Sequence, residues 1–503
     1  MKRLLQCVPA ALLVLFGFAL PTASAYAQEE GQTFVYTNNN NAGSNTVSAF
    51  SVLPGGALMP VPGSPFATLG TGQVGFVASH RITATVRRNL LFVANSGSNN
   101  ISVFKIDTDT GALTLVAAPF STGGSAGTFG ISLAATPNGR YLYAANGGSG
   151  TISAFGIASN GTLTSIGSTL VEARLDGSKV SPNGKFLGVA LQLSDRVAMF
   201  RIASNGALTA APGSPFSAAG GAGGAAADVE INCKSNLLFD PQNSFMTTVA
   251  VFTIASNGAL AQITGSPFNL TSGSNSNAGV LSPDNRHLLI SNQFSNTLTS
   301  LDVASGGSLT VETDSPSGPS PFANSLGAVT PLSLGTNREG KLLYASNSNG
   351  VVTGFHIDSD GGLSQVTGSP FPTGGTGSRP SLTVFPAHED EGGGDEVDHS
   401  GRKGHFEFEA DHACTDSGEM HFKEDSGHEM DGKVRAVSAT RNTATISGTG
   451  TLADGTPVTY TAVVLGNMPV IGANQFAISW ITATGSVFQT SGALTNGYIA
   501  VHP

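Results

Sequence analysis

Cysteine is scarce in this chain of 503 residues, which contains only Cys7, Cys233 and Cys414. Cys7 lies in the apolar N-terminal segment, and the other two fall in different predicted domains. The sequence therefore predicts no disulfide framework, and stability must come from packing. Cys233 lies in an apolar stretch, and we interpret it as a core thiol rather than a nucleophile.

Charge is also scarce, and positive charge is the smaller part of it. Charged residues make up 11% of the chain, and 23 Lys and Arg stand against 33 Asp and Glu, a net charge of −10. Binding to a nucleic-acid backbone needs a basic footprint. The composition therefore excludes nucleic acid as a partner.

Long apolar runs are missing beyond the first residues. Lys2 and Arg3 precede an apolar run over residues 4–20, and small residues in an A-x-A arrangement follow at 22–27. This order is typical of a cleavable signal peptide, predicted here over residues 1–27. The run is short of the roughly 20 residues that a membrane-spanning helix needs. We expect a secreted or periplasmic protein without a membrane span in the mature chain.

Glycine is abundant, with 65 residues, and it recurs in a repeated unit. The unit is an apolar strand, a turn, a second apolar strand with a large apolar residue near its end, and then Gly-x-Leu, often followed by Gly-Ser-Pro-Phe. The strand-end residues of the seven copies are Phe50, Phe104, Phe155, Phe200, Phe252, Leu301 and Phe355. A period of about fifty residues with several short strands per unit indicates a β-propeller of seven blades. The glycine of Gly-x-Leu is expected to adopt a positive φ between the outer strands.

The two ends of the repeat predict how the ring closes. The chain enters at residues 34–38, which match the second strand of a blade and have no inner strand before them. Residues 381–385 form a single strand pattern with no blade after it. We predict that this last strand completes the first blade, which removes exposed sheet edges. The propeller then spans residues 32–386.

The composition changes after the propeller. Residues 387–404 are acidic, contain histidine and have almost no apolar residue, so we interpret them as a linker. Residues 405–503 return to alternating apolar and polar positions, which predicts a small β-sandwich-like domain. The expected fold class is all-β, with a seven-bladed β-propeller followed by this small domain.

Some of these segments resemble known families. The propeller resembles the secreted lactonase-like, YVTN-type family, which includes bacterial 6-phosphogluconolactonase, at residues 34–38 (FVYTN), 92–95 (FVAN) and 181–184 (SPNG). The tail is more loosely similar to a post-COAP-type β domain, at residues 406–408 (FEF) and 476–478 (FAI). The first resemblance implies a propeller related to lactone hydrolases, and the second implies no named chemistry.

The resemblance also implies where an active site would lie. Enzymatic members carry Pro-His-x-His where this chain has Ala-Arg-Leu-Asp at 173–176, and Pro-Arg-His where it has Ala-Ala-Asp at 226–228. Lactone opening needs a base to activate water and a positive group to stabilise the oxyanion. The candidate bases are Asp176, Asp228 and Glu230, and the candidate electrophilic partners are Arg174 and Arg196.

Both signature histidines are missing, and this favours a non-catalytic binding or surface-interaction module. The alternative is a lactone hydrolase with a rearranged central-channel site. The expected partner is a small-molecule lactone, a glycan or a surface protein.

Most histidines gather near the linker among carboxylates, at His388, His399, His405, His412, His421 and His428. Imidazole and carboxylate bind divalent transition metals, so loose surface affinity for zinc, nickel or copper is one hypothesis. The spacing matches no compact motif, and we predict no structural or catalytic metal and no cofactor. His80 and His356 have no acidic partner nearby in the sequence, so we interpret both as structural.

Overall fold

The computed structural model describes most of the chain. Its described residues are 33–75, 79–218, 225–243, 248–269, 274–375, 379–386, 390–398, 401–411, 417–439, 442–466, 468 and 470–501. The predicted signal peptide, residues 1–27, lies outside them. Within the described residues no helix has the length and apolar character needed to cross a membrane.

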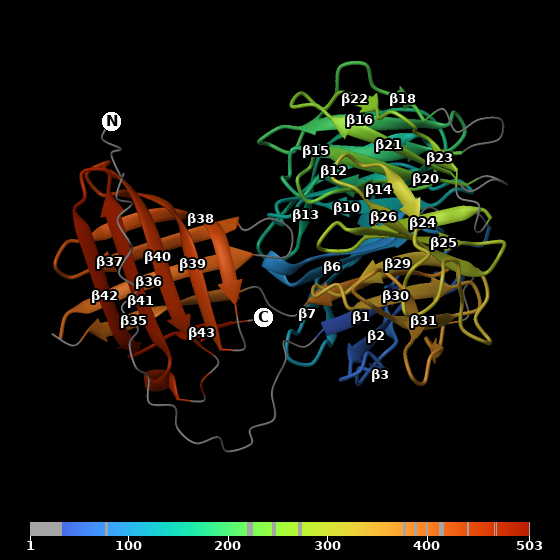
Figure 1. Cartoon of the computed structure of the whole chain (residues 1–503). Coiled ribbons are helices and arrows are strands. Elements are labelled where there is room, and N and C mark those ends of the chain that lie inside the picture. The colour runs from blue at the N-terminus through green and yellow to red at the C-terminus, as the bar shows by residue number, and fades with distance from the viewer. Residues whose placement is uncertain are drawn as a thin grey trace. The chain divides into compact units, whose positions relative to one another are not determined.

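Seven antiparallel sheets form the blades of the propeller (Figure 1). From the inside outward, blade 1 contains β34 (Ser381–Pro386), β1 (Thr33–Asn38), β2 (Thr46–Val52) and β3 (Leu58–Pro60), with β4 (Phe66–Ala67) beside β2. Blade 2 contains β5 (Ile82–Thr85), β6 (Leu90–Asn95), β7 (Asn100–Ile106), β8 (Leu113–Leu115) and β9 (Phe120–Ser121), and a 3-10 turn, η1 (Val86–Arg88), joins β5 to β6. Blade 3 contains β10 (Ile131–Ala135), β11 (Tyr141–Asn146), β12 (Thr151–Ile157) and β13 (Leu163–Leu170).

The remaining four blades repeat this order. Blade 4 contains β14 (Leu175–Val180), β15 (Phe186–Leu191), β16 (Arg196–Ile202), β17 (Leu208–Ala210) and β18 (Phe216–Ser217). Blade 5 contains β19 (Glu230–Ile231), β20 (Leu237–Gln242), β21 (Thr248–Ile254), β22 (Leu260–Gln262) and β23 (Phe268–Asn269). Blade 6 contains β24 (Ser276–Leu281), β25 (His287–Asn292), β26 (Thr297–Val303), β27 (Leu309–Val311) and β28 (Phe322–Ala323). Blade 7 contains β29 (Pro331–Thr336), β30 (Leu342–Asn347), β31 (Val351–Ile357), β32 (Leu363–Gln365) and β33 (Phe371–Pro372).

The ring closes as the sequence predicts. Strand β34 pairs antiparallel with β1, from Thr33 opposite Pro386 to Asn38 opposite Ser381. The inner strand of blade 1 is therefore supplied by the far end of the repeat. β34 also contacts β29 and β5, the inner strands of the neighbouring blades. Closure leaves no inner strand of the ring without a neighbour.

In five blades a Ser-Pro-Phe segment lies at the break between the two short outermost strands. In blade 1 the Ser64 hydroxyl accepts a hydrogen bond of 2.9 Å from the backbone N–H of Ala49 in β2, at the point where β3 has ended. Phe66 then pairs with Val47, near the start of the same strand. The serine thus satisfies a backbone donor between two short pairings. The same bond recurs from Met199 to Ser214, Val251 to Ser266, Ser300 to Ser320 and Gly354 to Ser369.

The Gly-x-Leu turns join adjacent blades. Gly56 has a φ of +84°, in agreement with the sequence prediction, and a Cβ at this position would lie 2.6 Å from Leu342 Cδ2 of blade 7. The Tyr344 hydroxyl donates a 2.7 Å hydrogen bond to the Gly56 carbonyl. Only a glycine allows both this backbone conformation and this close approach.

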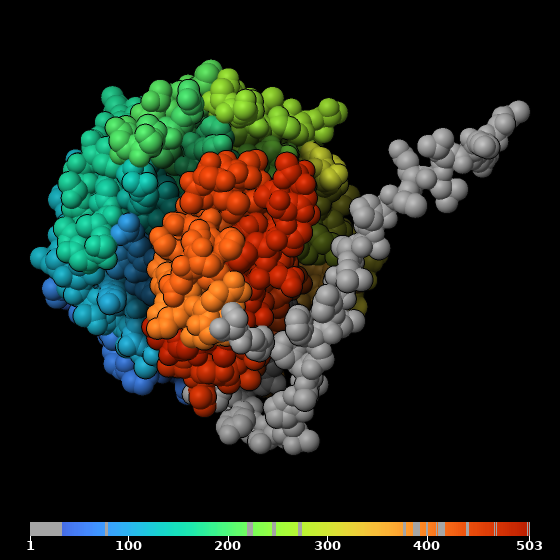
Figure 2. Space-filling model, turned by 90° about the vertical axis from the view of Figure 1, so that its left-hand side faces the viewer, coloured from blue at the N-terminus to red at the C-terminus, as the bar shows by residue number. Residues whose placement is uncertain are grey.

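The C-terminal strands form one closed sheet, shown from orange to red in Figures 1 and 2. The strands in chain order are β35 (Asp390–Asp398), β36 (Lys403–Asp411), β37 (Ser417–Glu424), β38 (Glu429–Ala439), β39 (Thr443–Leu452), β40 (Pro457–Leu465), β41 (Gln475–Thr482), β42 (Val487–Leu494) and β43 (Tyr498–Ala500), with the 3-10 turn η2 (Ile471–Ala473) before β41. Each strand from β36 to β41 pairs with the next one in the chain, and β35 pairs with both β36 and β42. Phe406 and Phe476 stack at 4.0 Å in its core.

Two details of the predicted tail are corrected by this sheet. The expected all-β fold is confirmed, but the small domain is a closed, barrel-like sheet rather than a two-sheet sandwich. Residues 390–398, placed in the predicted linker, form strand β35, which closes the sheet. Their acidic and glycine-rich composition does not predict a strand, and β35 forms because it pairs with β36 and β42 on its two sides.

Cys233 departs from its predicted role. It lies in the turn between β19 and β20 rather than in a strand, and its backbone N–H donates to Asn285 Oδ1 at 2.8 Å. It is disulfide-bonded, so it is not the core thiol that the sequence suggested.

Candidate functional site

A polar pocket lies at the end of the propeller channel where the inner strands begin. Two of the candidate site residues line it: Arg174 directly precedes β14, and Asp176 is its second residue. The other polar residues that line it are Gln192, Asn243, Asn277 and Arg379. They come from blades 4, 5, 6 and 1, so the closed ring gathers them from distant parts of the sequence.

The two arginines are held by different contacts. Arg174 has a φ of +64°, and its guanidinium carbon lies 5.1 Å from the centre of the Phe129 ring, which also lines the pocket. Burial lowers the pKa of Arg379 and the charge of Asp176 raises it, with the balance below the ordinary value. With its amide oxygen turned toward Arg379, Gln293 accepts from both terminal nitrogens at 2.9 and 2.8 Å.

Asp176 is the carboxylate among the described residues that line the pocket. It is half-buried, and its Oδ1 accepts a 3.0 Å hydrogen bond from the backbone N–H of Ser79. Burial raises the pKa of Asp176 to about 7, although the Ser79 bond acts in the opposite direction. This carboxyl group can therefore exchange a proton near neutral pH.

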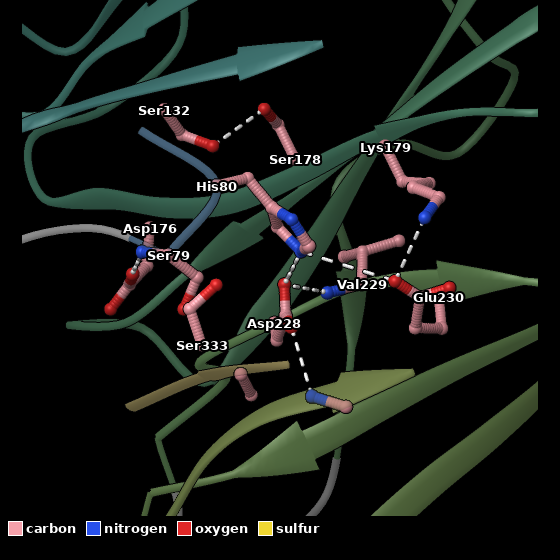
Figure 3. Close-up of polar contacts among 12 residues, drawn as sticks. Ser79, His80, Ser132, Asp176, Ser178, Lys179, Asp228, Val229, Glu230 and Ser333 are labelled. Carbon is pink, nitrogen blue, oxygen red and sulfur yellow. Dashed lines mark hydrogen bonds and ion pairs between the residues drawn. The ribbon is translucent and has the colours of Figure 1, made fainter. Parts of the chain in front are cut away.

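Close to Asp176 lies a network of ion pairs built on two buried carboxylates, Asp228 and Glu230 (Figure 3). His80 Nε2 lies 2.8 Å from Asp228 Oδ1 and 3.9 Å from Glu230 Oε1. Lys179 Nζ lies 3.0 Å from the same Glu230 oxygen. Asp228 is 0% exposed, and its carboxylate also accepts from the backbone N–H groups of Val229 at 2.9 Å and Gly279 at 3.0 Å. Each carboxylate of the network thus has a cationic partner.

Burial and charge oppose each other at every member whose pKa is shifted. Burial lowers the pKa of His80, whereas the charge and the hydrogen bond of Asp228 raise it. The raising effects are larger in sum, so the pKa of His80 lies above 6.5. Burial raises the pKa of Glu230, and Lys179 offsets part of the rise. Burial lowers the pKa of Lys179, and Glu230 raises it above its ordinary value. When His80 and Lys179 are both protonated, their charges balance those of the two carboxylates.

The same residues have metal-ligating atoms. His80, Asp228 and Glu230 offer one nitrogen and two oxygens that lie within 4.8 Å of one another. A divalent cation at this point would face the Lys179 ammonium and would displace the proton of His80. Since two cations already balance the two carboxylates, the chemistry fits an ion-pair network better than a metal centre.

The predicted site residues therefore fall into three places. Arg174 and Asp176 line the pocket, whereas Asp228 and Glu230 lie in the buried network. Arg196 lies elsewhere, 38% exposed at the start of β16, where its guanidinium is 2.5 Å from Glu172 Oε2. It is not among the described residues that line the pocket.

Sequence reasoning missed four residues: Ser79, His80, Lys179 and Arg379. His80 was interpreted as structural because no acid lies near it in the sequence, but its partner Asp228 is 148 residues away. Position in the repeat could have pointed to these residues, because His80 and Arg379 each lie two residues before an inner strand. Asn275 of blade 6 has a similar position, one residue before β24. All three have positive φ, at 55°, 59° and 63°.

The histidines of the tail form separate pairs. His405 Nδ1 lies 2.8 Å from Asp395 Oδ1, and His421 Nδ1 lies 2.6 Å from Asp431 Oδ1. His388, His399 and His412 lie outside the described residues. The loose metal affinity suggested by the sequence stays a prediction.

Comparison with known proteins agrees with the fold. Residues 124–218 match the family model described as Lactonase, 7-bladed beta-propeller. The chain is similar to a candidate 6-phosphogluconolactonase of Bacteroides fragilis, with 19% identity over 72% of this chain and 100% of that one, and a TM-score of 0.57. A candidate 6-phosphogluconolactonase of Bacteroides uniformis is similar with 17% identity over 71% and 100% of the two chains, and a TM-score of 0.56.

A protein of Lactobacillus plantarum shares the same fold, with 18% identity over 70% of this chain and 98% of that one, and a TM-score of 0.53. No curated protein matches this chain. The post-COAP-type resemblance of the tail stays a prediction. Over residues 124–218 the chain is thus similar to the family model of seven-bladed lactonase propellers, and its ring has the same fold as these solved structures.

Proposed function

We propose that the propeller binds a small anionic, hydroxyl-rich molecule, such as a sugar acid or a sugar lactone, in the channel pocket. The observation that carries this proposal is the presence of Arg174 and Arg379 in one pocket with Asp176 as its described carboxylate. Guanidinium groups form strong, often bidentate hydrogen bonds to carboxylate and phosphate. The rest of the pocket suits hydroxyl groups.

The pocket differs in charge from the protein around it. The chain has a net charge of −10, yet the pocket combines two arginines with a carboxyl group that is partly protonated near pH 7. The carboxamides of Gln192, Asn243 and Asn277 supply both donors and acceptors for hydroxyl groups. A locally positive, polar pocket in an acidic protein favours an anionic ligand.

We favour binding over catalysis because the polar groups of the buried network already have hydrogen-bond or ion-pair partners. Nε2 of His80 and both oxygens of Asp228 are engaged with each other or with backbone N–H groups. Glu230 is engaged with Lys179. These groups support the pocket, and they are not positioned to attack a ligand within it.

A lactone hydrolase is the second candidate, and one observation favours it. The pKa of Asp176, about 7, suits a general base, and Arg174 and Arg379 could stabilise an oxyanion. In this reaction Asp176 would take a proton from water as the water oxygen attacks the lactone carbonyl. The ring C–O bond then breaks, and the proton passes to the departing alkoxide.

Titration calorimetry with D-gluconate and 6-phospho-D-gluconate tests the binding role, with neutral D-glucose as the control ligand. Arg379→Gln and Arg174→Gln should each weaken anion binding by at least about tenfold, the size of one lost charge-assisted hydrogen bond. Arg196→Gln, which changes an arginine outside the pocket, should leave the affinity unchanged. Equal binding of glucose and gluconate would contradict the proposal.

Hydrolysis of a panel of sugar and aliphatic lactones separates the two candidates. Turnover that is lost in Asp176→Asn but retained in Arg196→Gln would establish the enzyme. Binding of anions without turnover on any lactone would establish the binding module.

A further inference from the structure

The residues just before β5 leave their own blade and cross the channel. We name residues 79–81 the axial segment. Ser79 donates its N–H to Asp176 of blade 4 at 3.0 Å and its hydroxyl to the carbonyl of Asn277 of blade 6 at 3.1 Å. His80 contacts Asp228 at the start of blade 5. Blades 4, 5 and 6 are not neighbours of blade 2, so the segment spans the axis of the ring. Figure 3 shows Ser79 beside Asp176 and His80 beside Asp228.

The axial segment touches three of the residues that line the pocket. Ser79 bonds to the Asp176 carboxylate and the Asn277 backbone, as described above. The Arg81 guanidinium donates to the backbone carbonyl of Arg379, and the Arg81 N–H donates to Ser381 Oγ at 3.2 Å. Ser79 and Arg81 are 4% and 2% exposed, so both are fixed in the interior. The segment therefore holds lining residues of the pocket from behind, although it is not itself part of the lining.

His80 is the anchor between these two residues. Its backbone has a φ of +55°, a conformation that a non-glycine residue adopts only when its surroundings enforce it. The charged groups that face it from the packed elements are Asp228 and Glu230 of blade 5, Lys179 and Asp176 of blade 4, and its neighbour Arg81. Asp228 makes the direct contact, and backbone N–H groups of Val229 and Gly279 hold Asp228 in turn.

We propose that His80 is a positioning residue of the pocket: its pairing with Asp228 holds the axial segment in place, and ligand affinity falls when that pairing weakens. The inference rests on the proposed function for its effect on the ligand. Its effect on Ser79 can be measured without any ligand. The Ser79 N–H reaches Asp176 only while the next residue is held across the channel.

The charge of His80 makes the proposed ligand affinity depend on pH. When His80 is protonated, it forms an ion pair with Asp228, and the network is neutral. Loss of that proton leaves one hydrogen bond and an excess negative charge close to Asp176, in the pocket that we propose binds anions. Affinity for an anion should therefore decrease as pH rises, even when the titration of Asp176 is removed by Asp176→Asn.

The direct test is hydrogen exchange at the Ser79 amide in the full protein labelled with 15N-serine, where Ser79→Ala assigns the signal. We expect His80→Ala to speed exchange by at least about tenfold. His80→Gln, which keeps a donor toward Asp228 but does not titrate, should retain most of the protection. His356→Ala changes another propeller histidine, on β31, and should have no effect on Ser79.

A pH series separates positioning from mere packing. After correction for intrinsic exchange, protection of Ser79 in the unmodified protein should fall as pH rises through the pKa of His80, and this step should be missing in His80→Gln. The series also decides the matter if His80→Ala does not fold.

The outcomes for the two proposals differ. Unchanged Ser79 protection in His80→Ala, or the same pH step in His80→Gln, would overturn the positioning role whether or not an anion binds. Faster exchange in His80→Ala with no gluconate binding to the unmodified protein would support the positioning role and contradict the proposed function. Faster exchange with an about tenfold weaker gluconate affinity would support both.

Discussion

Nε2 of His80 lies 2.8 Å from Oδ1 of Asp228, although 148 residues separate the two along the chain. One precedes the inner strand of blade 2 and the other precedes the inner strand of blade 5. The contact forms only when the ring has closed around the axis. The neighbouring pocket, whose Asp176 is bonded to Ser79, therefore depends on the fold of the whole propeller.

Removal of the Asp228 carboxylate should destabilise the protein. Asp228→Ala leaves His80 and two backbone donors without their acceptor in a buried position, and we expect a loss of about 3 kcal/mol in the free energy of unfolding. Urea unfolding followed by fluorescence measures it. Asp109→Ala, at an exposed turn between β7 and β8, should change the value by less than about 0.5 kcal/mol. Equal losses for the two variants would contradict the structural role of Asp228.

The stability that His80 contributes should depend on pH. Its pKa is raised above 6.5 in the folded protein, because burial, the largest single effect, is outweighed by the charge and hydrogen bond of Asp228 together with the charge of Glu230. The folded state therefore binds the proton more tightly than the unfolded chain. The contribution is fully present below pH 6.5 and is lost as pH rises through the folded pKa. The difference in unfolding free energy between the unmodified protein and His80→Gln should decrease over that window, and a constant difference would refute the assignment.

Asp176 should behave in the opposite sense. Burial raises its pKa from 3.8 to about 7, so the folded state keeps a proton that the unfolded chain has already lost. Ionising this carboxyl destabilises the fold, and the cost grows from pH 4 to pH 7 and is complete above that. Asp176→Asn should therefore increase stability at pH 8 and change it little at pH 4. Thermal melts at the two pH values measure this, and a variant that is less stable at pH 8 would rule out the raised pKa.

The parts of the fold that could be predicted are those determined by short sequence motifs. Gly56 and its equivalents mark the turns, and Ser64 and its equivalents mark the split outer strands, so the repeat and its count could be obtained from spacing. Arg174 and Asp176 were found because the family resemblance places residues 173–176 where enzymatic members carry Pro-His-x-His. Local pattern also gave the closing strand at 381–385.

The parts that were missed depend on long-range contacts. His80 acquires its partner only across the axis, and Arg379 joins the pocket only when β34 returns to blade 1. Strand β35 has a composition that disfavours strands, and its place comes from pairing with β36, β42 and β43. No local signal distinguishes a closed sheet from a two-sheet sandwich, because both show the same alternation.

Closure of the ring by β34 should be measurable. Deletion of residues 379–386 removes the inner strand of blade 1 and exposes the edge of β1, along which every residue from Thr33 to Asn38 is paired. We expect the melting temperature of the propeller to fall by several degrees or more, and the protein to aggregate more readily. Deletion of residues 399–400, outside the propeller, is the matched control. An unchanged propeller melt would mean that β34 does not support the ring.

Two adjacent glycines offer a test of packing between blades. Gly55 and Gly56 both have a φ of +84°, but a Cβ on Gly55 would meet nothing within 4 Å, whereas one on Gly56 would lie 2.6 Å from Leu342 Cδ2. Gly55→Ala should therefore cost only the backbone strain, about 1 kcal/mol. Gly56→Ala must also displace Leu342 at the seam between blades 7 and 1, and we expect a loss at least about 1 kcal/mol larger. Because the backbone strain is common to both variants, the difference isolates the contact with Leu342. Equal losses of unfolding free energy in urea would show that Leu342 moves aside without a measurable energetic cost. The glycine of Gly-x-Leu would then be needed only for its positive φ.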